Sequence, residues 1–269
     1  MRHTETMAPR VRPPAVAGLF YPAEPGELRA CVAQLLADNP ATGPVPKALI
    51  APHAGYVYSG PVAARAYNLL APGAARLRRV VLLGPAHRVA LRGLALPDCM
   101  AFRTPLGDVP LDGQAMAELD ELPGIVRSDE AHREEHSLEV HLPFLQTVLE
   151  RFTLVPLVVG WSEPGQVSRV LERLWGGDET LVVVSSDLSH YHAYAQARRL
   201  DEDTAHCIES ESPSLEGEQA CGAYPLNGLL TYARRRQLSI TRLDLRNSGD
   251  TAGGRDRVVG YGAWSLHAA

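Results

Sequence analysis

The chain has 269 residues, of which 45% are hydrophobic and 21% are charged. This composition is typical of a globular protein that can bury a large core. The net charge of −5 favours neither nucleic acids nor anionic membranes as partners. The N-terminal residues do not resemble a signal peptide, and no stretch reaches the roughly 18 apolar residues of a membrane span, so we expect a cytoplasmic protein with reduced cysteines.

Residues 1–14 are polar and rich in proline, and we predict that they form a flexible arm before a single domain over residues 15–269. The domain begins with a helix over about 25–38, where apolar residues recur at helical spacing. The apolar stretch "ALIA" predicts a short buried strand. "GPVAARAYNLL", which follows it, predicts a helix with Pro61 near its first turn.

Further apolar strands alternate with helices over most of the remaining chain. "RRVVLLGP", "TLVPLVVG" and "ETLVVV" predict buried strands, and "PGQVSRVLERLW", "AYAQARRLDEDTAHCIES" and "CGAYPLNGLLTYARRRQ" predict helices. The last two strands, "LSITRLDLR" and "DRVVGYGAWSLH", lack a helix between them, which favours an antiparallel pair. This order predicts an α/β fold with one mixed, largely parallel sheet between two layers of helices.

The segment "HREEHSLEVHLPFLQTVLERF" predicts one amphipathic helix. Pro143 lies inside this segment and should distort the helix unless a new first turn begins there. The apolar stripe on which the prediction rests consists of Leu138, Leu142, Leu145 and Leu149.

The polar residues of the same segment have two interpretations, a solvated helix face or part of a site. His136 and Glu139 are three residues apart and would share one face of the helix, with Glu135 beside them. For His136 neither interpretation is favoured by the residues alone. For His141 the solvated face is favoured.

Three apolar strands end in short loops that carry polar side chains. These loops contain His53, His87 and the pair Asp187 and His190. In an open parallel sheet, ligands bind beyond the carboxyl ends of the strands, so these side chains are predicted to converge at one edge. Imidazoles gathered in this way suit zinc, copper or iron, although a single histidine at a strand end is more often a capped or solvated residue.

Cys221 lies beside a glycine and ahead of a predicted helix in "ACGAYPLNG". A thiol near a helix N-terminus has a lowered pKa, which suits a metal ligand or a redox role. From the residues alone, however, a buried structural cysteine is the favoured interpretation. Ser186, Asp187 and His190 could be imagined as a hydrolase triad, but triad members normally come from separate segments.

Several motifs together resemble the Memo family, whose bacterial and archaeal members are often labelled AmmeMemoRadiSam system protein B. "PHAGYVYSG", "GPAHR", "EEHSLEVHLPFLQ", "SSDLSHY" and "CGAYPLNGLL" occur in the order and spacing of that family. "RPPAVAGLFYPA" and "VVGYGAW" resemble its two ends, so the resemblance covers nearly the whole chain. It implies a fold similar to class III extradiol (LigB-type) dioxygenases, a single α/β domain with a mixed sheet between helix layers.

The resemblance also implies a metal pocket. The histidine of the PHAGY motif, the histidine of the GP-x-H motif and the cysteine of the CG motif line this pocket in the family, and they fall here on His53, His87 and Cys221. A thiolate with two imidazoles favours copper or zinc and tolerates iron. The expected cofactor is therefore iron or copper, with zinc as an alternative. Dioxygenase activity does not follow from the shared fold.

The remaining motif residues receive catalytic roles. The aspartate and histidine of the SSD-x-x-H motif are Asp187 and His190, and the histidine of the EHS motif is His136. We predict an iron- or copper-dependent oxidoreductase in which Asp187 and His190 orient ligands or move protons. His136 is predicted to act as a general acid or base, or to position a substrate.

Two other functions stay open at this point. One is a non-catalytic module that binds a peptide or partner, with Tyr56 and Tyr58 beside the His53 loop as contacts, unless these rings pack under the following helix. The other is a metal store or chaperone that binds metal without turnover. The system label implies an AMMECR-type protein and a radical-SAM protein as partners.

Overall fold

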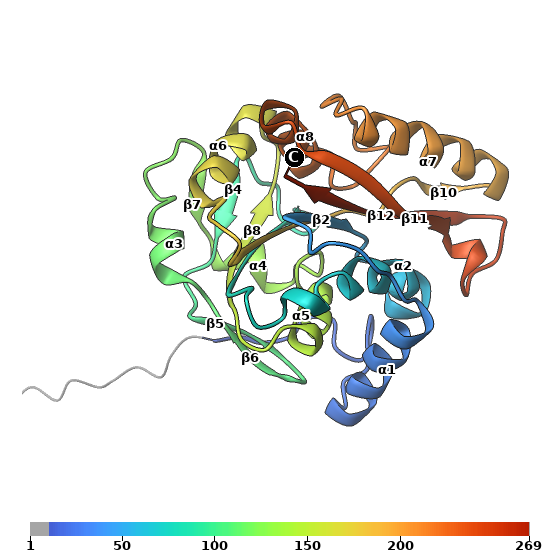
Figure 1. Cartoon of the computed structure of the whole chain (residues 1–269), viewed down its shortest axis with the longest axis horizontal. Coiled ribbons are helices and arrows are strands. Elements are labelled where there is room, and N and C mark those ends of the chain that lie inside the picture. The colour runs from blue at the N-terminus through green and yellow to red at the C-terminus, as the bar shows by residue number, and fades with distance from the viewer. Residues whose placement is uncertain (1–10, 269) are drawn as a thin grey trace, which may run out of the picture.

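A mixed sheet of nine strands forms the centre of the computed structural model, which describes residues 11–268 (Figure 1). The four central strands run parallel in the order β2, β9, β3 and β8, whereas β10, β11 and β12 pair antiparallel. The predicted fold class is confirmed. In spatial order the strands are β10 (His190–His192), β12 (Val258–His267), β2 (Ala48–Ala51), β9 (Thr180–Ser185), β3 (Arg79–Pro85), β8 (Thr153–Val159), β4 (Leu94–Leu96) and β7 (Ile125–Arg127), with β11 (Ser239–Asn247) paired to β12.

Helices cover both faces of this sheet (Figure 1). The central strands are buried on both sides, which explains their continuous apolar sequences: in β2, Leu49 and Ala51 belong to one core, and Ala48 and Ile50 to the other. No helix in the described part of the chain has the length and apolar character needed to cross a bilayer. One layer contains α1 (Pro25–Asp38), α2 (Tyr56–Asn68) and α5 (Leu142–Val148); the other contains α3 (Gly113–Ala117), α6 (Pro164–Leu174), α7 (Tyr194–Glu209) and α8 (Ala223–Arg236).

The end of the predicted flexible arm is instead part of the fold. Val11 and Arg12 form strand β1, which pairs with β5 (Ala101–Thr104) in a small sheet completed by β6 (Gly107–Pro110). The prediction is therefore wrong for these two residues, because the Arg12 side chain is buried and hydrogen-bonded to the interior. The first ten residues of the predicted arm lie outside the described residues.

The segment predicted as one amphipathic helix is broken into three pieces. These are α4 (Asp129–Arg133), the 3₁₀ helix η2 (Glu139–His141) and α5, and residues 134–138 are not helical. Pro143 lies in the first turn of α5, the restart that the prediction allowed. The leucine stripe is buried in spite of the break.

Gly84 of β3 explains how the non-helical segment fits against the sheet. A Cβ atom added to this glycine would lie 2.7 Å from Oγ of Ser137 and 2.9 Å from Cδ2 of Leu138. The segment 134–138, which we call the His136 loop, thus packs directly on the backbone of β3. It carries His136 to the edge of the sheet where the strand-end histidines lie.

Helix α2 begins earlier than predicted. Tyr56 is its first residue and is buried, with its hydroxyl donating to the carbonyl oxygen of Val140 (2.7 Å). Pro61 consequently lies inside the helix rather than in its first turn. The carbonyl of Val57 loses its helical partner at Pro61, but Val57 is 64% exposed, so water can bind this oxygen.

Candidate metal centre

The predicted strand-end residues follow neighbouring parallel strands. β9 lies between β2 and β3, and Ala51 of β2 is paired in register with Ser185 of β9. His53 and His87 therefore emerge on either side of the loop that carries Asp187. This arrangement brings residues more than 100 positions apart to one edge of the sheet, as expected for parallel strands.

Three histidines form a cluster at this edge. His53, His87 and His136 each offer a ligand atom, and these atoms lie within 4.8 Å of one another. The ring centroids are 5.2 Å apart for His53 and His87, 5.4 Å for His53 and His136, and 4.7 Å for His87 and His136. We call these three residues the histidine cluster. The ring of Phe20 packs against that of His136, with centroids 4.9 Å apart.

The hydroxyl of Ser185 determines the tautomer of His53. It donates to the carbonyl oxygen of Ser137 (2.6 Å), and it lies 2.6 Å from Nδ1 of His53 and 2.7 Å from Nε2 of His141. Because its single proton is used on the carbonyl, both imidazole nitrogens must be donors. His53 therefore carries its proton on Nδ1 and keeps the lone pair on Nε2. Nδ1 of His141 is left to accept from the hydroxyl of Tyr67 (2.7 Å).

Two further histidines at this edge have the same orientation. Nδ1 of His87 lies 2.9 Å from Oε1 of Glu135, and Nδ1 of His190 lies 2.7 Å from the carbonyl oxygen of Leu188. Both partners are acceptors, so Nδ1 carries a proton in each ring, and Nε2 is the nitrogen with the lone pair in the neutral form. A histidine that donates one N–H to a protein acceptor in this way is the usual arrangement of a metal ligand.

Burial disfavours the protonated form of His53 and His136. Desolvation, together with the neighbouring imidazoles, holds the pKa of His53 well below its usual value. Desolvation also lowers the pKa of His136 to about 4, although the charge of Glu135 opposes this change. Burial alone would raise the pKa of Glu135, but hydrogen bonds and charge from His87 bring it down to about 2. His53 and His136 are thus in the uncharged form that binds metal ions at neutral pH.

Cys221 lies beside the cluster. Its Sγ is 3.3 Å from Nε2 of His53 and accepts the backbone N–H of Asp187 at 3.3 Å. It precedes α8 as predicted, but the expected lowering of its pKa is wrong. Burial, with the nearby charge of Asp187, raises the pKa of this thiol. A coordinated metal ion would reverse this, because it displaces the thiol proton.

Asp187 points back into the protein. Its Oδ1 accepts the backbone N–H of His53 (2.7 Å), so the carboxylate holds the His53 loop in place. Burial raises the pKa of Asp187 to about 7, against the opposing effect of the backbone hydrogen bonds from His53 and Ala54. His190, which begins β10 directly after this loop, is only partly buried, and desolvation lowers its pKa.

The residues at this edge fit a transition metal. Neutral imidazoles with free Nε2 lone pairs, and a cysteine in contact with one of them, are a donor set for copper, zinc or iron. In addition, Nδ1 of His136 is buried and forms no hydrogen bond within residues 11–268, although Oε1 of Glu135 lies 3.4 Å away. A buried nitrogen without a hydrogen bond is costly unless another partner occupies it.

Two residues of the broken helix have roles that the helical interpretation missed. His141, for which a solvated face was favoured, is 1% exposed, and its Nε2 forms a hydrogen bond with the hydroxyl of Ser185. Glu139 does not share a face with His136; its carboxylate is bound to Arg12 and accepts the backbone N–H groups of Ala15 and Val16. A strict 3.6-residue period could not show this, because the chain leaves the helix at residue 134.

The fold and the site define an α/β protein with a histidine-rich centre at the carboxyl edge of its parallel strands. A profile of the family described as Memo-like protein matches residues 12–265, and the chain belongs to this family. It is 35% identical over 266 residues to a MEMO1 family protein of Aquifex aeolicus (strain VF5), covering 94% of this chain and 97% of that protein. It is 36% identical over 278 residues to a MEMO1 family protein of Aeropyrum pernix, covering 94% and 99%.

A solved structure also resembles the fold. The crystal structure of the uncharacterized protein JW3007 from Escherichia coli K12 superposes with a TM-score of 0.51 and covers 80% of this chain and 98% of that one. The two sequences are 16% identical, so this similarity supports the fold alone.

Proposed function

We propose that this protein binds a redox-active transition metal, iron or copper, at the histidine cluster and acts as an oxidoreductase. The observation that carries the proposal is the meeting of three imidazoles, His53, His87 and His136, with ligand atoms within 4.8 Å of one another. Histidine and cysteine together suit copper and tolerate iron. When bound, such a metal ion supplies electron transfer and a Lewis-acidic position for a substrate.

We assign His53, His87 and Cys221 as the ligands. Nδ1 of His53 and of His87 is held by Ser185 and Glu135, so that Nε2 of each ring is available. Cys221 is in contact with Nε2 of His53. His136 is the alternative third ligand, because it lies in the same cluster.

The neighbouring polar residues would handle protons. Asp187 holds the His53 loop, and its pKa of about 7 suits a group that exchanges a proton near neutral pH. His190 keeps a lone pair on Nε2 for the same purpose. His136, if it is not a ligand, would act on the substrate as the predicted general acid or base.

Elemental analysis of anaerobically purified protein tests the metal site. We expect about one equivalent of iron or copper in the wild type and in a control variant, His206→Ala, which changes an exposed histidine of α7. We expect little metal in the double variant His53→Ala/His87→Ala. Equal metal in the double variant and the control, or no transition metal in any of them, would contradict the proposal.

Spectroscopy of the copper(II)-loaded protein separates the two candidate third ligands. A thiolate ligand gives a sulfur-to-copper charge-transfer band, which Cys221→Ser should abolish and His136→Ala should leave in place. Absence of this band in the wild type, with copper binding lost in His136→Ala and kept in Cys221→Ser, would assign His136. Oxygen consumption by the loaded protein with an added reductant then separates an oxidoreductase from a metal store, since a store binds metal without turnover.

The alternative of a peptide-binding module loses part of its basis. Tyr56 is 4% exposed and packs in the core, so of the predicted aromatic pair only Tyr58, at 40%, is available to a partner. The AMMECR-type and radical-SAM partners stay predictions.

A further inference from the structure

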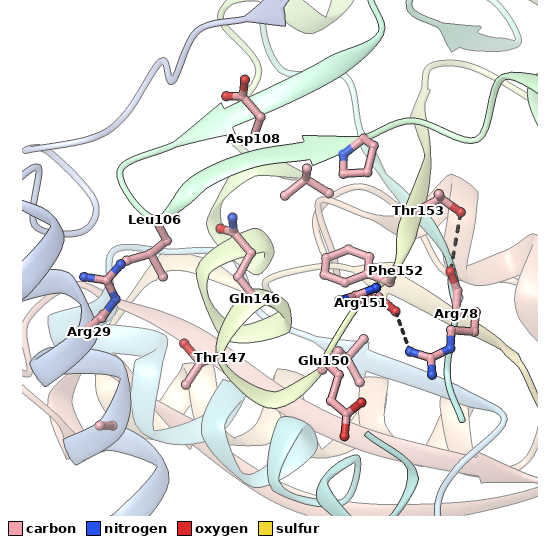
Figure 2. Close-up of a pocket in the computed structure, with 14 residues that line it drawn as sticks. Arg29, Arg78, Leu106, Asp108, Gln146, Thr147, Glu150, Arg151, Phe152 and Thr153 are labelled. Atoms are coloured by element: carbon pink, nitrogen blue, oxygen red, sulfur yellow. Dashed lines mark hydrogen bonds between the residues drawn. The ribbon is translucent and has the colours of Figure 1, made fainter. Parts of the chain in front are cut away.

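A cavity lies at the opposite edge of the sheet from the histidine cluster. Its volume is about 1030 Å³, the upper end of the range for small-molecule sites. It lies at the amino ends of β3 and β8, between α1, the β5–β6 hairpin and α5 (Figure 2). We call it the amino-end groove.

The groove has an apolar lining, and hydrogen bonds join two of the elements that form its walls. The side chains that form the apolar part are those of Leu106, Val109, Pro110, Leu149 and Phe152. Gln146 ties the hairpin to α5, because it accepts the hydroxyl of Thr104 (2.6 Å) and donates to the carbonyl oxygen of Gly107 (3.1 Å). An apolar ligand body could therefore be held between two elements that are already joined.

Arginines stand at both ends of the groove. Figure 2 shows Arg29 beside Leu106 on one side, and Arg78 and Arg151 on the other. Within residues 11–268, none of these three guanidinium groups has a carboxylate within 4.0 Å; one N–H of Arg78 donates to the carbonyl oxygen of Arg151 (3.4 Å).

The carboxylates of the lining do not balance these arginines. Asp108 is already bound by Arg103 through two hydrogen bonds of 2.6 and 2.9 Å. Glu150 is exposed and is not in an ion pair within the described residues. The groove therefore combines an apolar body with an excess of positive charge at its ends, in a chain whose net charge is −5.

We infer that the amino-end groove binds an organic anion with an apolar body and a carboxylate or phosphate head. The apolar lining would bury the body, and the guanidinium groups would bind the head through charge-assisted hydrogen bonds. This inference does not rest on the metal centre, because the two sites lie at opposite ends of the parallel strands.

Displacement of 1-anilinonaphthalene-8-sulfonate, an apolar sulfonate probe, tests the inference on the full-length protein. We expect saturable binding of the probe and displacement by decanoate or decyl phosphate, the better competitor identifying the head group. The uncharged decanol should compete much less. Equal displacement by decanol and by both anions would overturn the inference, since it would show that the arginines play no part.

Variants of residues that line the groove test whether the anion binds there. Arg78→Gln/Arg151→Gln should weaken binding of the better anion by about tenfold, the size expected for lost charge-assisted contacts. Ala33→Trp should block the groove, since Ala33 is an exposed lining residue of α1 whose replacement leaves the core intact. The matched control Arg234→Gln, on exposed α8 surface, should bind as the wild type does.

Circular dichroism in the near ultraviolet checks that each variant keeps its native packing. Wild-type affinity in both the double arginine variant and Ala33→Trp would overturn the inference. So would binding that is lost equally in Arg234→Gln. The variant His53→Ala/His87→Ala should keep its full affinity for the anion, so failure of the metal proposal and failure of this one are distinguishable.

Discussion

Ser185 connects the sheet to the proposed metal site through one hydroxyl group. It accepts from His53 and His141 and donates to the carbonyl oxygen of Ser137. This residue is the last of β9, where an apolar strand reaches the polar edge. A hydroxyl in this position specifies which nitrogen of His53 has the lone pair, and hence which nitrogen can bind a metal.

Replacing this hydroxyl should weaken metal binding. We expect Ser185→Ala to lower the affinity for Zn²⁺, used as a probe ion, by about 10- to 100-fold, the range for lost supporting hydrogen bonds. A competition titration against a chelator measures this affinity. The control Ser168→Ala removes another buried hydroxyl, on α6 and away from the cluster, and should bind Zn²⁺ as the wild type does. Unchanged affinity in Ser185→Ala would show that the tautomer of His53 is held in some other way.

At the scale of elements, the N-terminal strand supports the His136 loop. Arg12 of β1 donates to the carbonyl oxygens of His132 (2.8 Å) and Glu135 (2.7 Å) and forms a buried ion pair with Glu139. Of these three acceptors, His132 precedes the His136 loop, Glu135 lies in it and Glu139 follows it. The short strand therefore fixes the position of a residue in the cluster more than 120 positions away in the sequence.

Removal of the Arg12 side chain should destabilise the protein. We expect Arg12→Ala to lower the free energy of unfolding by about 3–5 kcal/mol, because the carboxylate of Glu139 would stay buried without its counterion. Urea denaturation followed by circular dichroism measures this loss. The control Arg103→Ala breaks an exposed ion pair with Asp108 and should leave the unfolding midpoint almost unchanged.

Hydrogen exchange adds a local test of the same contact. Amide exchange in residues 134–138 should accelerate in Arg12→Ala more than exchange in α8, on the other face of the sheet. Equal stability of the Arg12 and Arg103 variants would contradict the role of Arg12 as an anchor of the His136 loop.

For the whole molecule, buried histidines should make stability depend on pH. Burial lowers the pKa of His132 to about 4 and that of His141 to about 3, and it holds those of His136 and His53 below the usual 6.5. An unfolded chain takes up protons at these residues as the pH falls below about 6.5, whereas the native chain does not. Stability is therefore present above that pH and is lost as the pH falls toward 4.

Two buried carboxyl groups act in the opposite direction. Burial raises the pKa of Asp187 to about 7 and that of Asp201 to about 6. The native chain therefore takes up these protons before the unfolded chain does, which adds stability as the pH falls from 7 toward 4. Because the buried histidines outnumber these acids, we expect a net loss of stability between pH 6.5 and 4.5.

Urea denaturation of the metal-free protein at several pH values measures this loss. In His132→Gln the slope of stability against pH should decrease by up to about 1.4 kcal/mol per pH unit, the contribution of one proton. In the control His206→Gln, at an exposed position, the slope should not change. A stability that rises from pH 6.5 to 4.5 would contradict the expected balance.

Much of the fold could be predicted because its signals are local. The apolar runs of β2, β3, β8 and β9 and the helical spacing in α1 are readable over short windows. Parallel strands place their carboxyl ends at one edge, so the strand ends bearing His53, His87 and Asp187 followed from the same pattern. The break after Arg133 was not predictable, because the helical spacing of the leucines continues through it although the backbone is no longer helical there.

The sequence by itself determined the α/β fold, the family and the edge of the sheet where polar residues gather. Only the tertiary structure decided how these residues act together: that His136 joins His53 and His87, that Ser185 and Glu135 orient two of the rings, and that Glu139 binds Arg12. The physical reason is sequence distance. The contact of Cys221 with His53 spans 168 positions and that of Glu139 with Arg12 spans 127, and no local period of apolar residues carries information over such a separation.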